Sequence, residues 1–169
     1  MSRELFILRH AKSDWDSSAK TDSERPLNKR GRKDAPRIGA WMREHYLYPG
    51  WVLCSTAVRA RETLNALAQE LELQPERIQF SQDLYLADLR TLLKVLHEIP
   101  PEQNSVMLVG HNPGLDDLVN FLSNMPIPLT DTGKLMTTAC LAEFKLPDNW
   151  DDLKGKGELV HIVRPADLN

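Results

Sequence analysis

Apolar residues along this chain fall into two patterns that alternate. The runs 5–8 (LFIL) and 106–109 (VMLV) are uninterrupted, which is typical of strands buried on both faces of a sheet. Between such runs, apolar residues recur every three or four positions, as at Leu64, Leu67 and Leu71, and this spacing predicts amphipathic helices. The predicted strands span residues 4–8, 51–54, 77–81, 105–109, 137–146 and 158–163, and the predicted helices span residues 28–45, 58–70, 88–98 and 115–123.

This order of elements predicts an α/β fold. Helices that alternate with strands cover both faces of a sheet, which gives a three-layer αβα sandwich around a mostly parallel sheet of about six strands. The loop 147–157 is too short to hold a crossover helix, so one antiparallel edge strand is expected. Pro36 predicts a kink or a late start in the first helix. With 169 residues and no linker or repeat, the chain is expected to form a single domain over 1–169.

Basic and imidazole side chains follow three of the predicted strands. Arg9 and His10 end the first strand. Arg59 lies on the first turn of the helix after the second strand, and His111 follows the strand at 105–109. The carboxyl ends of parallel strands meet at one edge of the sheet, where ligands of α/β proteins bind. Because positive charges brought so close repel one another unless an anion lies among them, the pattern predicts a phosphate site.

Four short motifs contain or accompany these side chains. They are LRHAKS at 8–13, ERPLNKRG at 24–31, STAVRARET at 55–63 and VGHNPG at 109–114. With these motifs in this order, the chain resembles the histidine phosphatase superfamily, and within it the small phosphohistidine phosphatases of the SixA type. The resemblance implies a phosphoglycerate mutase-like fold and an enzyme that removes phosphate through a phosphohistidine intermediate.

The chemistry of the four strand-end side chains suggests a role for each. His10 would attack phosphorus as the nucleophile, and it must be neutral to do so. Arg9 and Arg59 would clamp the phosphoryl oxygens, and His111 would donate a further hydrogen bond. Since guanidinium groups supply the positive charge, neither a metal ion nor another cofactor is expected.

Three further residues are expected to bind substrate, namely Ser13, Arg25 and Asn112. The Ser13 hydroxyl can donate to a phosphate oxygen or can close the turn after the strand. Arg25 can contact the substrate or can brace its own loop. The sequence leaves these alternatives open.

The sequence contains no clear general acid. Asp83, Asp88 and Glu62 are candidates, but none stands in a recognisable acid motif. An alkoxide leaving group needs such a donor, whereas a phosphorylated imidazole takes a proton from water and leaves as neutral imidazole. The expected substrate is therefore phosphohistidine on a protein. The alternatives are a phosphatase for small phosphate monoesters and a non-catalytic module that binds phosphate or protein.

Composition excludes several other classes of protein. The chain is 41% hydrophobic and 27% charged, with a net charge of −3, so nucleic acid is not an expected partner. No run approaches about 18 consecutive apolar residues and no signal-peptide pattern is present, so neither a membrane partner nor secretion is expected. The two cysteines, Cys54 and Cys140, have no metal-ligand spacing. A cytoplasmic, metal-free enzyme is the expectation.

Overall fold

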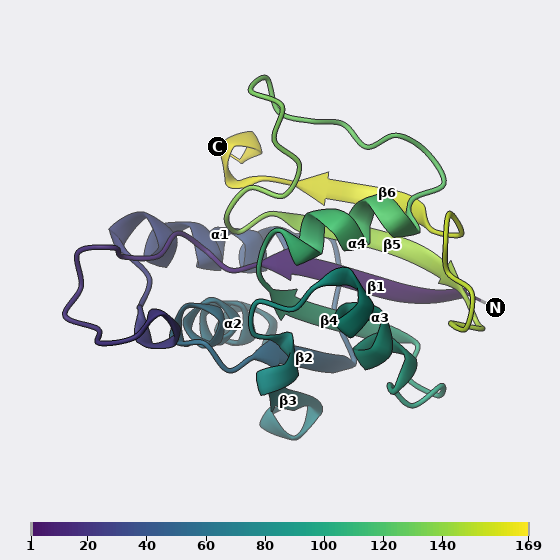
Figure 1. Ribbon diagram of the computed structural model, residues 1–169, viewed down its shortest axis with the longest axis horizontal. Helices are drawn as coiled ribbons and strands as arrows, with labels where there is room; N and C mark the ends of the chain where they lie inside the picture. The colour runs from purple at the N-terminus through teal and green to yellow at the C-terminus, as the bar shows by residue number, and fades with distance from the viewer. Residues whose placement is uncertain (1, 169) are drawn as a thin grey trace.

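The structure, a computed structural model, describes residues 2–168 and is built around one six-stranded sheet (Figure 1). In chain order the elements are β1 (Ser2–Arg9), η1 (Asp22–Glu24), α1 (Lys29–Glu44), β2 (Trp51–Ser55), α2 (Val58–Leu71), η2 (Pro75–Arg77), β3 (Ile78–Ser81), η3 (Gln82–Leu84), α3 (Leu89–His97), β4 (Ser105–Gly110), α4 (Gly114–Leu122), β5 (Leu141–Pro147), β6 (Glu158–Val163) and η4 (Pro165–Asp167), where η marks a short 3-10 turn.

The strands lie in the order β3-β2-β4-β1-β5-β6. β1, β2, β3 and β4 are parallel to their neighbours within this group. β5 is antiparallel to β1, and β6 at the edge is antiparallel to β5. The strand that runs antiparallel to the others is β5, which lies next to the edge strand β6. The predicted mostly parallel sheet with an antiparallel pairing at one edge is confirmed.

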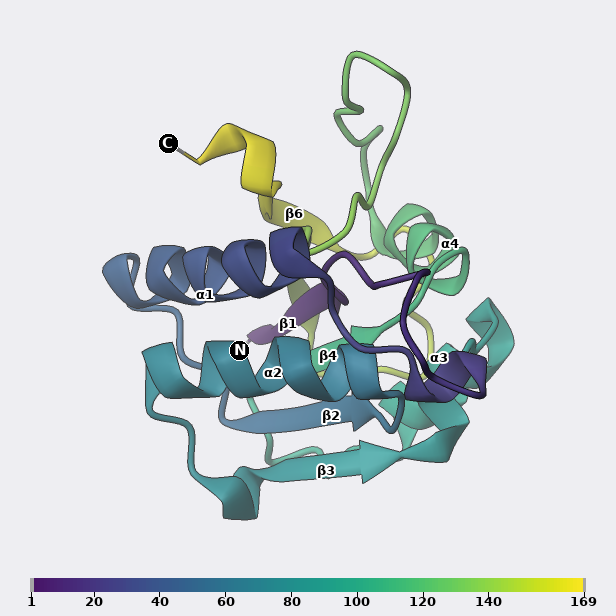
Figure 2. The ribbon, with the colours of Figure 1, turned by 90° about the vertical axis from the view of Figure 1, so that its left-hand side faces the viewer.

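Two apolar cores separate the three layers. Leu5 and Ile7 of β1 point to one face and pack in a core with α3 and α4, while Phe6 and Leu8 point to the other face and pack with α1 and α2. All four side chains are completely buried. The figures show α1 and α2 side by side on one face of the sheet and α3 and α4 on the other (Figures 1 and 2). The uninterrupted apolar run arises because both faces of β1 are covered.

Most element boundaries agree with the sequence prediction, with two informative differences. α1 begins at Lys29 rather than late, since the Asn28 side chain accepts a hydrogen bond from the backbone N–H of Gly31 and caps the helix, which continues through Pro36. The strand predicted at 137–146 begins only at Leu141. The preceding residues form a buried turn, in which Ala139 has a φ of 60°.

The parallel strands bring their carboxyl ends to one edge of the sheet. β1 ends at Arg9, β2 at Ser55 and β4 at Gly110, so the three motifs that follow these strands are neighbours in space. None of the helices within residues 2–168 combines the length and the apolar character needed to cross a lipid bilayer.

Candidate active site

A cavity of about 330 Å³ opens at the carboxyl ends of β1, β2 and β4. It contains all of the residues predicted from the sequence as catalytic or substrate-binding, together with several that the sequence did not indicate. The lining residues are Arg9, His10, Lys12, Ser13, Trp15, Asp22, Arg25, Arg59, Leu86, His111, Asn112 and Thr138.

His10 is fixed at the base of this pocket by its backbone and its ring. Its backbone N–H donates to the Gly110 carbonyl at 3.1 Å, and its carbonyl accepts from the Ala139 N–H at 3.0 Å. The ring Nδ1 lies 2.8 Å from the carbonyl oxygen of Ala11. A carbonyl can only accept, so the hydrogen bond assigns the ring proton to Nδ1. The other nitrogen, Nε2, then carries a free lone pair, as a nucleophile requires.

The surroundings of His10 keep its ring neutral. Burial is the main cause that lowers the pKa of His10 to about 3, and the positive charges of Arg59 and Arg9 act in the same direction, as does His111. The hydrogen bond to Ala11 opposes this shift only in part. At neutral pH the ring is therefore uncharged and its lone pair is available.

The loop after His10 is held by two helices. The backbone N–H of Ala11 donates to Thr63 Oγ1 at 2.9 Å, and the Thr63 hydroxyl donates to the Arg59 carbonyl at 2.7 Å. Gly31 in α1 lies so close to the loop that a Cβ there would be 2.2 Å from the carbonyl oxygen of Lys12. The motif at 24–31 thus contributes a glycine whose missing side chain lets α1 approach the loop after His10.

Arg59 enters the pocket from the first turn of α2 and is 3% exposed. Its Nη1 donates to the backbone carbonyl of Asp22 at 2.8 Å, and its Nη2 donates to Asp22 Oδ2 at 3.0 Å. The Tyr85 hydroxyl donates to the same carboxylate oxygen at 2.5 Å. The hydrogen bonds to the carboxylate lower the pKa of Asp22 to about 2, and the bond from Tyr85 contributes most. The carboxylate is therefore ionised at neutral pH.

Arg9 is tied to the long loop that precedes β5. Its Nη1 donates to the Met136 carbonyl at 2.9 Å, and Asn112 Nδ2 donates to the same oxygen at 3.0 Å. The Met136 N–H in turn donates to Asp116 Oδ1 at 3.0 Å. The backbone of one residue, Met136, therefore connects Arg9 with Asn112 and with α4.

His111 completes the group from the end of β4. Its Nε2 shares a hydrogen bond of 2.7 Å with Ser55 Oγ, and its ring centroid lies 5.1 Å from that of His10. Burial is the main cause that lowers the pKa of His111 to about 4, with Arg59 acting in the same direction. Ser55 Oγ also accepts from the Ala57 N–H, so its own proton can go to His111 Nε2. His111 Nδ1 then carries a proton and can donate.

Three buried nitrogens of these side chains have no hydrogen-bond partner within residues 2–168. They are Arg9 Nε, Arg59 Nε and His111 Nδ1. Buried polar atoms without partners are rare and costly in proteins. An anion held among two guanidinium groups and an imidazole supplies acceptors for donors of this kind.

Arg25 braces the outer loop of the pocket. Its Nη1 donates to Ser13 Oγ, and its Nε and Nη2 donate to Asp22 Oδ1 at 3.2 and 3.1 Å. Its guanidinium also lies 3.5 Å from the ring centroid of Trp15. Of the two alternatives for Arg25, the structure contains the brace. Because Ser13 Oγ accepts from Arg25, its own proton remains free to donate to a ligand.

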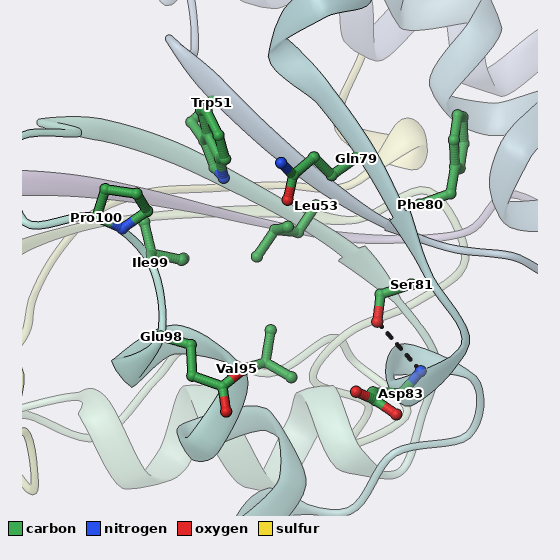
Figure 3. A pocket seen from close by; sticks show the side chains of 10 residues that line it. All are labelled: Trp51, Leu53, Gln79, Phe80, Ser81, Asp83, Val95, Glu98, Ile99 and Pro100. Carbon is green, nitrogen blue, oxygen red and sulfur yellow. Dashed lines mark hydrogen bonds between the residues drawn. The ribbon is translucent and has the colours of Figure 1, made fainter.

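The candidate acid Asp83 lies outside the pocket. It lines a separate cavity of about 280 Å³ between β2, β3 and α3, where its backbone N–H donates to Ser81 Oγ (Figure 3). The sequence placed Asp83 near the third strand correctly, but could not predict on which side of η3 the carboxylate would lie.

The other two candidate acids cap or brace backbone elsewhere. Asp88 accepts from the Thr91 N–H at 2.9 Å and caps α3. Glu62 accepts from the Leu27 N–H at 2.8 Å and lines a different surface hollow. The carboxylate that does line the His10 pocket is Asp22, which the sequence analysis missed.

Tyr85 and Ser55 were missed as well. Tyr85 lies edge-on to His111, with ring centroids 5.4 Å apart, and Ser55 orients the same imidazole. The signal for Ser55 was present, since it opens the motif at 55–63. Asp22 and Tyr85 meet only through the fold of two loops, which no spacing in the sequence encodes. No group of three or more metal-ligating side chains occurs within the described range 2–168.

Comparisons with known proteins agree with this geometry. The model of the histidine phosphatase superfamily (branch 1) matches residues 5–85. An uncharacterized protein of Mycobacterium leprae is 32% identical over 93% of this chain and 100% of its own length. An uncharacterized chloroplastic protein of Arabidopsis thaliana is 30% identical over 98% of this chain and 79% of its own length.

Solved structures are similar over almost the whole chain. The protein histidine phosphatase SixA in complex with tungstate has a TM-score of 0.80 and 26% identity, covering 98% of this chain and 99% of its own. A protein of Nakamurella multipartitia assigned to SixA has a TM-score of 0.81 and 27% identity, covering 98% and 97%.

The fold and the comparisons together define an enzyme that removes phosphate by a histidine-based mechanism. The chain belongs to the histidine phosphatase superfamily, and it is of the SixA type.

Proposed function

We propose that this protein hydrolyses phosphohistidine on a protein substrate through a phosphorylated His10. His10 Nε2 attacks phosphorus while the P–N bond to the substrate imidazole breaks. Water then attacks the phosphohistidine enzyme, releasing inorganic phosphate and restoring neutral His10. Arg9 and Arg59 hold the phosphoryl oxygens as their charge shifts, and His111 Nδ1 donates a further hydrogen bond.

The observation that carries the proposal is the state of His10. Its Nδ1 proton is committed to the Ala11 carbonyl, its pKa is about 3, and its Nε2 faces no partner within the described chain. A neutral, oriented imidazole among two arginines is a nucleophile for phosphorus rather than a ligand for a carboxylate or a metal ion.

The positions and the ionisation of the carboxylates favour hydrolysis of a P–N bond over that of a P–O bond. Asp83, Asp88 and Glu62 lie away from the pocket, and Asp22 is ionised through its bonds to Tyr85 and Arg59. No protonated carboxyl is thus at hand for an alkoxide. An imidazole needs none, since water protonates it as it leaves. The structure in complex with tungstate is that of the protein histidine phosphatase SixA, which supports the same substrate class.

The test compares phosphate release from a phosphohistidine peptide and from an aryl phosphate by the wild type and by His10→Asn. Asn keeps a donor for the Ala11 carbonyl, so the loop should stay in place while the nucleophile is lost. We expect activity on the phosphohistidine peptide to fall below a few per cent, and an acid-labile, base-stable phosphoryl group to be trapped on the wild type only.

Other outcomes point to other functions. Faster turnover of the aryl phosphate than of the phosphohistidine peptide would identify a small-molecule phosphatase. Binding of either compound without turnover would identify a phosphate-binding module. We also propose that no metal takes part, so activity should survive a chelator, and a need for added divalent ions would contradict this.

A further inference from the structure

Two exposed apolar side chains stand at the rim of a pocket that is otherwise polar. Among its lining residues, the large apolar ones are Trp15 and Leu86, which are 73% and 55% exposed. Trp15 comes from the loop after β1, and Leu86 comes from the segment between η3 and α3. Large apolar side chains left in water beside a binding pocket commonly mark the surface where a partner sits.

The indole of Trp15 is held in place rather than loose. One of its faces is covered by the guanidinium of Arg25, 3.5 Å from the ring centroid. Arg25 is itself fixed by hydrogen bonds to Ser13 and to Asp22. Most of the indole nevertheless stays in solvent, so Trp15 presents a pre-positioned apolar surface with little entropy left to lose on binding.

Leu86 adopts a backbone conformation that is unfavourable for leucine. Its φ is 51°, in the left-handed region that a leucine disfavours. The segment is fixed on both sides, since the Tyr85 hydroxyl bonds Asp22 and the carbonyl of Ala87 packs against Gly114. A Cβ at Gly114 would lie 2.0 Å from the Ala87 oxygen. This strained, exposed leucine adds nothing to the core.

We propose that Trp15 and Leu86 bind apolar side chains next to the phosphorylated histidine of a polypeptide substrate. The inference rests on the proposed function. A phosphoryl group seated among Arg9, Arg59 and His111 places its carrier in the same pocket that the exposed Trp15 and Leu86 line. A polypeptide is large enough to contact Trp15 and Leu86, whereas a free phosphorylated imidazole contacts only the polar side chains around the phosphoryl group. The rim therefore selects the sequence around the phosphohistidine.

The experiment uses three probes: phosphoimidazole, a phosphohistidine peptide with leucine on both sides of the histidine, and the same peptide with serine there. The wild type should prefer the leucine peptide about 10-fold in kcat/KM, mainly through KM. Leu86→Gly should remove most of this preference without a folding penalty, because glycine accepts the positive φ. Trp15→Ala should do the same, and Trp15→Phe should restore part of it.

Tyr46→Gly is the matched control. Tyr46 is 85% exposed and has a φ of 56°, but it follows α1 at the end of the sheet opposite the pocket. Its replacement should leave the ratio of the two peptides unchanged.

The ratio of kcat/KM on the leucine peptide to that on the serine peptide distinguishes the possible results. Equal wild-type rates on the two peptides, or a ratio that survives in both Leu86→Gly and Trp15→Ala, would overturn the rim proposal alone. An equal loss on phosphoimidazole and on both peptides would also overturn it, since the residues would then act on the pocket. A wild type inactive on all three probes would instead overturn the proposed function.

Discussion

The two buried histidines should make the protein sensitive to mild acid. In the unfolded chain His10 and His111 have a pKa of about 6.5. In the folded protein these pKa values are about 3 and about 4, chiefly because of burial. At pH values between the folded and the unfolded pKa, each histidine binds a proton in the unfolded chain but not in the folded protein. The free energy of unfolding is therefore largest above about pH 6.5 and falls as the pH drops toward 4.

The size of this effect follows from the shifts. At about pH 5 each histidine is almost fully protonated in the unfolded chain and almost neutral in the fold. Each then costs about 2 kcal/mol relative to pH 7.5, or about 4 kcal/mol for the pair. This is a large part of the 5–15 kcal/mol that is usual for a domain, so unfolding at about pH 5 should begin at clearly lower urea concentration.

Urea unfolding followed by circular dichroism at about pH 7.5 and pH 5 measures the effect. The double variant His10→Asn with His111→Gln keeps donors or acceptors for the Ala11 carbonyl and for Ser55 Oγ, but cannot take up the protons. Its stability should change by less than about 1 kcal/mol between the two pH values. His97→Gln is a control, because that ring lies on the surface.

A wild type whose stability is the same at both pH values would refute the reasoning. So would a double variant that loses as much stability in acid as the wild type, since the drop would then come from other groups. Addition of tungstate should raise the stability of the wild type at both pH values if it binds the folded pocket.

Three further predictions concern single residues. Arg59→Ala should lower kcat/KM on phosphohistidine by roughly 10²–10³-fold, and Arg59→Lys should recover only part of this, because a point charge cannot replace a planar two-point donor; full rescue by Lys would contradict a clamp. Asp22→Asn should lower the inhibition constant of tungstate by roughly 10-fold, because a negative charge that competes for Arg59 is removed; weaker inhibition would show that Asp22 mainly positions the arginine. Gly114→Ala should lower the melting temperature by several degrees, since the added Cβ would meet the Ala87 oxygen at 2.0 Å, and an unchanged value would mean that the loop yields easily.

The sequence was sufficient for the sheet and for the floor of the pocket. The run 5–8 is apolar at every position because both faces of β1 are covered, and that pattern is local. Arg9 is the last residue of β1, His10 and His111 directly follow β1 and β4, and Arg59 follows β2 by a few residues. Parallel pairing alone then brings these residues together.

The walls of the pocket were beyond the sequence because they depend on loop conformation. Asp22 reaches Arg59 across 37 positions and Tyr85 reaches Asp22 across 63, through turns without any periodic pattern. For the same reason the sequence could not indicate that the candidate acids Asp83, Asp88 and Glu62 do not line the pocket. The segment 137–140 (TTAC) was predicted as the start of a strand because it leads without a break into the apolar residues of β5, and its turn at Ala139 has no sequence signal of its own.

The position of β1 in the sheet has a consequence for folding during synthesis. Leu5 pairs with Val106 on one side and with Phe144 on the other. β1 is thus an inner strand that is synthesised before both of its neighbours in the sheet, β4 and β5. During translation this apolar strand stays unpaired until β4 and β5 have emerged, which favours slow folding and exposes the strand to chaperones. The pocket around His10, at the end of β1, can form only after β4 and His111 have been synthesised.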